Sequence, residues 1–268
     1  MEYLKFFGIG ILGGAVAGLL GIGGGVLIIP ILLYITSVEV KAATAISVVQ
    51  TFFASSFGTL FNHLQKTINF RYALIFGLSS TVTYFFGSYF TQYITDTTIK
   101  VIYLCTAVLA MVLFFIKRNN SDSSKESKIV ANLVPDNKAY LKIVPISLVA
   151  GFAFGILGVG GGFFYVPLLV ILFDFPLKIA IGTSLMIIFC NAIFGIAGKL
   201  LAVRFDFFIG LSVALGAIGG SRIGVYINEK IKPQIIRVIF IILLTITIIR
   251  VGVDLFSSFT CKQLFFLS

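Results

Sequence analysis

Residues 18–33 read GLLGIGGGVLIIPILL, and a near copy, GILGVGGGFFYVPLLV, occupies residues 155–170. Each copy lies inside a run of 30 residues without a charge, 6–35 and 143–172. A straight helix of that length would be about 45 Å long, whereas the hydrocarbon core of a bilayer is about 30 Å thick. Three consecutive glycines also disfavour a helix. Each long run is therefore predicted to be a discontinuous helix or a re-entrant hairpin, interrupted at its glycines.

The composition of the whole chain indicates a membrane protein. Its 268 residues are 59% hydrophobic, its mean hydropathy is +1.10 and only 11% of the residues are charged, against about 25% in soluble domains. Too few polar side chains remain to cover a water-soluble globule, so the surroundings must be mostly lipid. The net charge of +10 comes from Lys and Arg in short breaks between apolar runs. That pattern favours positive-inside loops over a nucleic-acid-binding surface, and we expect no nucleic-acid partner.

The apolar segments form two sets of four that are related by a constant shift of 137 residues. The shift aligns, among others, Gly14 with Gly151, Pro30 with Pro167, Lys41 with Lys178 and Ser47 with Ser184, without a gap. Such a repeat predicts an all-α polytopic membrane protein of about eight hydrophobic segments, built from a duplicated four-segment unit. Residues 1–116 would form the first transmembrane repeat and residues 143–268 the second. The polar residues 117–142 would form a cytoplasmic linker, because most of the 20 Lys and Arg lie on its side of the membrane.

The glycine clusters are the leading candidates for a binding site. Unwound backbone at membrane depth must be buried in protein or line a wet cavity, and broken helices at matching positions of two halves point to a transporter site. A half-helix that starts after the glycines directs its free N–H groups at the break, which suits an anion. Close helix packing through small residues is the alternative explanation for these glycines. The predicted substrate-binding residues are Gly23, Gly24, Gly25, Ser47, Thr51, Gly160, Gly161, Gly162, Thr183, Ser184 and Asn191, with Pro30 and Pro167 as structural breaks.

The polar members of this set lie along the second segment of each half. Ser47 and Thr51 share one helical face in the first half, and Ser184 and Asn191 share the matching face in the second, with Thr183 at its margin. These side chains would contact the substrate or serve as hydrogen-bonded ties between helices, and the sequence leaves both roles open.

Several other functions are disfavoured by the residues present. The single histidine, His63, excludes a multi-histidine metal site, and three cysteines in unrelated positions suggest neither a zinc site nor a redox pair. The apolar runs hold no nucleophile with a base, so we expect neither an enzyme nor a cofactor. They also hold no Asp or Glu, so a carboxylate proton relay is not visible.

The two glycine-rich stretches resemble the twice-repeated signature of the TauE/SafE sulfite exporter family of membrane permeases. NFRYALIFG at residues 69–77 and RFDFFIGLSVALGAIGGSRIG at residues 204–224 extend the resemblance over nearly the whole chain. It implies a cell-membrane permease for a small anion such as sulfite, a sulfonate or a related organosulfur anion, working by alternating access. An uncoupled anion channel and a non-transport scaffold or assembly protein are the alternatives. The expected partners are the substrate anion and the lipid bilayer; a coupling ion and a homo-oligomer are left open.

Overall fold

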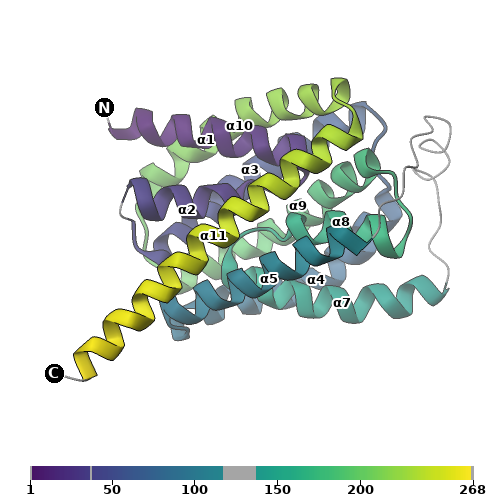
Figure 1. Cartoon of the computed structure of the whole chain (residues 1–268). Coiled ribbons are helices and arrows are strands. Elements are labelled where there is room, and N and C mark those ends of the chain that lie inside the picture. The colour runs from purple at the N-terminus through teal and green to yellow at the C-terminus, as the bar shows by residue number, and fades with distance from the viewer. Residues whose placement is uncertain (1, 37, 117–136, 267–268) are drawn as a thin grey trace.

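The computed structural model describes residues 2–36, 38–116 and 137–266, and no strand occurs in these ranges. The elements in chain order are α1 (Glu2–Leu20), α2 (Gly25–Ile35), α3 (Val40–Leu64), α4 (Phe70–Phe90), the 3-10 helix η1 (Thr91–Tyr93), α5 (Asp96–Ile116), α7 (Asn137–Leu157), α8 (Gly162–Leu172), α9 (Leu177–Ala202), α10 (Phe207–Lys230) and α11 (Pro233–Phe266). Most of them lie roughly along one direction and form a bundle (Figure 1).

Eight of the described helices are long and apolar enough to cross a membrane, which confirms the predicted all-α polytopic fold. Helices α2 and α8 have 11 residues each and are too short to cross. Helices α9 and α3 lie at the centre of the bundle. In the most apolar stretch of each helix, 67% of the residues are buried in α9 and 56% in α3, whereas only 28% are buried in α5 and in α11.

Each short helix forms a re-entrant hairpin with the long helix before it. A Cβ added at Gly13, in the middle of α1, would lie 2.3 Å from Ile28 of α2, and Phe6 belongs to the same buried cluster as Ile28. In the second half, α8 turns back beside the end of α7, where the rings of Phe154 and Phe163 are 5.3 Å apart, and it packs mainly on α9 and α5. Of the two forms expected for the long apolar runs, the structure therefore has the hairpin.

The first helix of each half packs against the third membrane-crossing helix of the other half. A Cβ at Gly14 of α1 would lie 2.3 Å from the Ala217 carbonyl of α10, and a Cβ at Gly155 of α7 would lie 2.3 Å from the Tyr84 carbonyl of α4. Only glycine permits such close backbone contact. Close packing therefore accounts for these glycines. It also acts at the breaks, where a Cβ at Gly158 would lie 2.4 Å from the Thr44 carbonyl oxygen.

Equivalent helices of the two halves run in opposite directions. Helices α3 and α9 are related by the 137-residue shift, and Gly58 of α3 meets Leu185 of α9 while Gly195 of α9 meets Val48 of α3. These pairings require an antiparallel arrangement. The two chain ends lie on the same side of the bundle, and α7 begins on the opposite side (Figure 1). The halves are thus arranged as inverted repeats, a question that the charge pattern left open.

Equivalent side chains also start equivalent helices. The Asn69 side chain accepts a hydrogen bond of 3.1 Å from the Tyr72 amide at the start of α4, and the Asp206 side chain accepts one of 2.8 Å from the Phe208 amide at the start of α10. Both are N-caps, which satisfy amides that have no partner within the helix.

Helix α7 begins at Asn137, within residues 117–142 that the sequence assigned to the linker. The last part of that segment is therefore helical. Residues 117–136, on which the rest of the linker prediction falls, lie outside the described residues.

Candidate functional site

The glycine clusters form the two breaks, which we define as residues 21–24 between α1 and α2 and residues 158–161 between α7 and α8. Positive φ angles between 67° and 82° occur at Gly21, Gly23, Gly24, Gly158, Gly160 and Gly161. Residues other than glycine rarely adopt this left-handed conformation. Every residue of both breaks is buried. The glycines are thus required for the turn of each hairpin.

The two breaks lie directly against each other. A Cβ at Gly162, the first residue of α8, would lie 2.1 Å from the Gly21 carbonyl oxygen and 2.6 Å from the Ile22 Cα atom. A Cβ at Gly25, the first residue of α2, would lie 2.8 Å from the Val159 Cα atom. The N-termini of α2 and α8 therefore meet at one place, where the halves touch through backbone.

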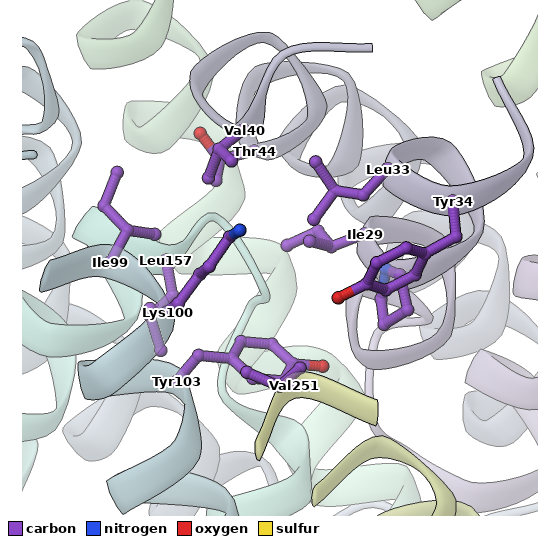
Figure 2. A pocket seen from close by; sticks show the side chains of 11 residues that line it. Ile29, Leu33, Tyr34, Val40, Thr44, Ile99, Lys100, Tyr103, Leu157 and Val251 are labelled. Carbon is purple, nitrogen blue, oxygen red and sulfur yellow. The ribbon is translucent and has the colours of Figure 1, made fainter. Parts of the chain in front are cut away.

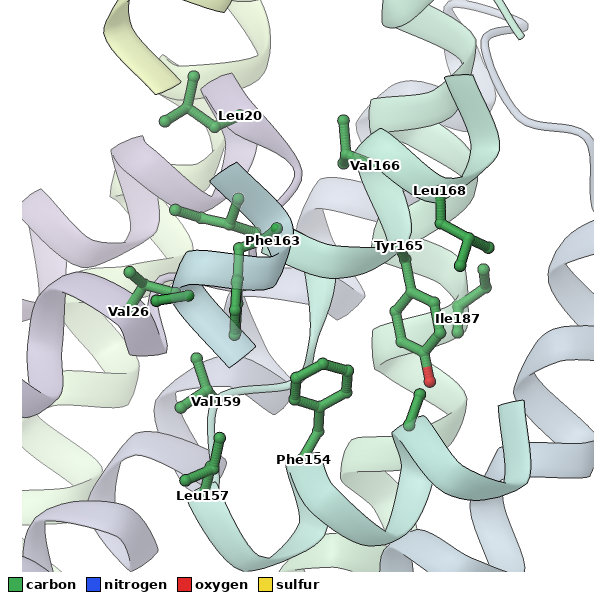
Figure 3. Close-up of a cluster of buried hydrophobic side chains, with 14 of the residues drawn as sticks. Leu20, Val26, Phe154, Leu157, Val159, Phe163, Tyr165, Val166, Leu168 and Ile187 are labelled. Carbon is green, nitrogen blue, oxygen red and sulfur yellow. The ribbon is translucent and has the colours of Figure 1, made fainter. Parts of the chain in front are cut away.

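Apolar side chains surround this meeting point. Leu20 and Val26 flank the first break, whereas Val159 lies within the second and Phe163 follows it, with Phe154 beneath Phe163 (Figure 3). All five side chains are buried. Polar groups at the breaks consequently lie in surroundings of low dielectric constant, where a hydrogen bond is stronger and an unpaired polar group is costly.

Two serines tie each half to the break of the other half. The Ser47 hydroxyl of α3 donates to the Gly158 carbonyl at 2.8 Å, and the Ser184 hydroxyl of α9 donates to the Gly21 carbonyl at 2.8 Å. The two bonds are equivalent under the 137-residue shift. Both serines were predicted site residues, and the structure places them at the breaks as ties between helices.

The remaining predicted side chains divide between the breaks and other places. The Thr51 hydroxyl donates to the Gly23 carbonyl at 2.9 Å, so it lies at the first break. Thr183 accepts a hydrogen bond of 3.0 Å from the Asn69 amide and therefore supports the start of α4. Asn191 is buried between α9 and α4, where its amide oxygen accepts from α4 hydroxyls.

Helices α2 and α8 run through Pro30 and Pro167, so the discontinuities lie at the glycines and not at these prolines. Pro30 has no N–H group for the Val26 carbonyl, the partner it would have in a regular helix. That carbonyl instead accepts the Tyr103 hydroxyl of α5 at 2.8 Å. A side chain from a neighbouring helix thus restores the hydrogen bond that the proline removes.

A buried lysine near the second break was not anticipated. Lys199 of α9 is 1% exposed, and its ammonium donates to Thr44 Oγ1 at 3.0 Å, Thr91 Oγ1 at 2.7 Å and the Ile156 carbonyl at 2.9 Å. Ile156 precedes the second break by two residues. In sequence, Lys199 stands at the end of an apolar run, where a lysine normally marks a membrane surface. Only the tertiary structure reveals its burial.

The symmetric pair Lys41 and Lys178 has a capping role instead. Lys41 donates to the Gln92 carbonyl at 2.9 Å, and Lys178 donates to the Glu229 carbonyl at 2.8 Å. Each lysine thus bonds a carbonyl at the end of the third crossing of its own half. A cation in this place satisfies a carbonyl that has no partner within the helix and interacts favourably with the helix dipole.

A small cavity lies beside α2, with the Lys100 side chain pointing into it (Figure 2). Its lining residues are Ile29, Pro30, Leu33, Tyr34, Val40, Thr44, Ile99, Lys100, Tyr103, Leu157 and Val251. The volume of about 20 Å³ accommodates about one water molecule, far below the roughly 300 Å³ of small-ligand sites. Lys100 forms an ion pair with Asp254 of α11.

Comparison with known proteins agrees with this architecture. Residues 6–251 match the model of the family described as sulfite exporter TauE/SafE. The chain is 27% identical to a probable membrane transporter protein of Bacillus subtilis, over 95% of this chain and 97% of that protein. It is 26% identical to a probable membrane transporter protein of Methanocaldococcus jannaschii, over 86% of this chain and 88% of that protein. No solved structure matches the chain. A family match across both hairpins and all eight candidate membrane-crossing helices means that this chain belongs to the sulfite exporter TauE/SafE family of membrane transporters.

Proposed function

We propose that the protein carries a small anion, namely sulfite, a sulfonate or a related organosulfur anion, across the cell membrane by alternating access. The observation that carries this proposal is the contact of the two breaks, where Gly162 meets Gly21 and Gly25 meets Val159. Two half-helix N-termini converge there, and free backbone N–H groups at helix N-termini attract anions. The family match supports membrane transport as the general activity.

The proposed binding set contains the glycines of both breaks and the polar side chains around them. It consists of Gly23, Gly24, Gly25, Ser47, Thr51, Gly160, Gly161, Gly162, Thr183, Ser184 and Asn191, with Thr183 acting through the start of α4. Backbone amides and hydroxyls hold an anion through hydrogen bonds without a fixed charge in contact with it. Such a site binds weakly enough to release its ligand in each cycle.

The inverted arrangement suggests how access would alternate. Each half contributes one hairpin and three further crossing helices, and the halves meet at the breaks. Ser47 and Ser184 tie them together through one hydrogen bond each. A hydrogen bond of this kind contributes about 1 kcal/mol net, so thermal motion can break it during transport. Rocking of one half against the other would open the breaks to one side of the membrane and then to the other.

Reconstitution into proteoliposomes tests the proposed function. Uptake of labelled sulfite would be measured against sulfate, phosphate, methanesulfonate and chloride as competitors, with and without unlabelled sulfite inside the vesicles. Saturable uptake that internal sulfite accelerates would support a carrier. Uptake without saturation or acceleration would indicate a channel, and no flux of any anion would indicate a scaffold.

A further inference from the structure

Three buried polar atoms without a hydrogen-bond partner gather on one side of the meeting point of the breaks. They are the hydroxyls of Tyr84 and Tyr165 and the Nδ2 atom of Asn191. Tyr84 faces the Gly160 backbone, and Tyr165 faces Ser80 and Asn191, but none of these contacts has the distance and angles of a hydrogen bond. All three side chains have 0% exposure. Buried donors are almost always paired in folded proteins, so three orphaned donors together at one break require an explanation.

The surrounding helices hold these donors in place. The Asn191 Oδ1 atom accepts from Ser80 at 2.7 Å and from Thr81 at 3.4 Å, which leaves the Nδ2 hydrogens free. The Tyr84 ring lies so close to Gly195 that a Cβ there would be 2.3 Å from a ring carbon. These contacts restrict the Asn191 and Tyr84 side chains before a ligand binds, which lowers the entropic cost of ordering them.

The first break lacks this set of donors. Under the 137-residue shift, Asn191 corresponds to Ala54, Tyr165 to Ile28 and Tyr84 to Ser221. Ala54 belongs to a buried cluster of three alanines with Ala17 and Ala217. Among the residues that the structure describes, Gln50, beside Gly24, is the one side-chain amide near the first break with an unpaired nitrogen. The backbone is thus arranged alike in the two halves, whereas the side-chain chemistry is not.

The second break also has the only fully buried ammonium among the described residues, that of Lys199. All three of its acceptors require a hydrogen from the lysine. Thr44 Oγ1 already donates to the Lys41 carbonyl, Thr91 Oγ1 has carbonyl acceptors of its own, and the Ile156 carbonyl can only accept. Three N–H groups are present in the charged form of lysine and not in the neutral one.

The charge of Lys199 has no partner of opposite sign in the described part of the chain, where Lys100 and Asp254 form the one ion pair. Lys41, which is also positive, lies close enough to repel it. A buried charge without a counter-charge is unfavourable, and an anion bound nearby would relieve that cost. The corresponding residue of the first half, Asn62, is neutral.

We propose that the transported anion binds at the second break alone, between the Asn191 amide and the hydroxyls of Tyr84 and Tyr165. The N-terminal amides of α8 complete the site. Lys199, which bonds the Ile156 carbonyl two residues before this break, supplies the opposite charge as a positioning residue, without touching the ligand. Donors without acceptors suit an oxyanion such as a sulfite or sulfonate group. This inference rests on the proposed function and narrows its binding set. The second break becomes the binding half, whereas the glycines of the first break and Thr51, which bonds Gly23, shape the contact between the halves without touching the anion.

Anion affinity in purified protein tests the proposal, with sulfite, sulfate and methanesulfonate as probes in titration calorimetry. Tyr84→Phe, Tyr165→Phe and Asn191→Ala should each weaken binding by about tenfold or more, since each removes a hydrogen bond to a charged ligand. Tyr103→Phe is the matched control. It removes a buried hydroxyl on the side of the first break, where the corresponding residue of the second half is already Phe240. The Tyr103→Phe variant should bind each anion with the same affinity as the wild type.

The Lys199→Met variant tests the charge separately. It should weaken sulfate binding by a larger factor than methanesulfonate binding, because Coulomb attraction grows with ligand charge. If the role of Lys199 were purely structural, Lys199→Met would lower both affinities equally or would only lower the melting temperature. Lys199→Arg keeps the charge and should restore the preference for the dianion. If the wild type binds the probes but Tyr103→Phe weakens binding as much as Tyr84→Phe does, the one-sided site is refuted. If the wild type neither binds nor transports any probe, the proposed function itself fails.

Discussion

A methyl group at Gly162 would force the two halves of the protein apart. The Cβ of an alanine there would lie 2.1 Å from the Gly21 oxygen and 2.6 Å from the Ile22 Cα atom, whereas an ordinary contact is 3.4 Å or more. Both neighbours are backbone atoms, so no side chain can rotate away. The breaks would have to separate by roughly 1 Å, and overpacking of this kind costs about 1–3 kcal/mol.

Gly162→Ala should therefore lower the free energy of unfolding by about 1–3 kcal/mol and reduce sulfite flux by at least about tenfold, the change expected from about 1.4 kcal/mol. Thermal unfolding in detergent and flux in proteoliposomes would be measured on the same preparations. Gly219→Ala is the matched control, because Gly219 also lies in a helix and a Cβ there meets nothing within 4 Å. It should be neutral or stabilising by up to about 1 kcal/mol, with normal flux. Equal stability and flux in the two variants would refute the inferred tight contact between the breaks.

Three further outcomes are expected. Ser47→Ala and Ser184→Ala should each lower the free energy of unfolding by about 1 kcal/mol, because the hydrogen bonds of both serines to the opposite break are 2.8 Å long. Denaturation of the single and double variants measures these two losses. A loss confined to one serine would contradict the equivalence of the two hydrogen bonds. Asp254→Asn should cost about 1 kcal/mol or more, since it disrupts a part-buried ion pair with Lys100 and a contact with Tyr34. A smaller loss in thermal unfolding would mean that the pair contributes little to stability. Single cysteines would replace Tyr3 and Lys66 in a cysteine-free background. The two positions should be labelled from opposite sides of the membrane, position 66 from the cytoplasm. Labelling of both positions from the same side would overturn the inverted arrangement.

The hydrophobic pattern was sufficient to predict the class of fold. Apolar runs must be helical in lipid because every backbone N–H and carbonyl group needs a partner within its own segment. Eight candidate membrane-crossing helices therefore followed from length and composition. The glycine clusters also predicted the position of the breaks, because consecutive glycines disfavour a helix wherever they stand.

Polar side chains were harder to assign, because their roles depend on helices distant in sequence. Ser47 and Ser184 were predicted as substrate-binding residues, whereas their hydrogen bonds to the opposite half are a property of packing. Tyr84 and Tyr165 look like ordinary aromatic residues of apolar runs. Their hydroxyls become noticeable only when the helices around them leave those hydroxyls without partners.

The local features of this protein can be read from its residues: the apolar helices, the glycine clusters and the 137-residue shift between its halves. The hairpin form of the long apolar runs, the inversion of the halves and the burial of Lys199 emerge from the packing of the whole chain. The two groups of features differ in the range of the interactions that produce them. Hydrophobicity and backbone propensity act within a few residues, whereas the direction of a helix and the burial of a charge are set by contacts between segments more than 40 residues apart, such as that of Lys199 with Ile156.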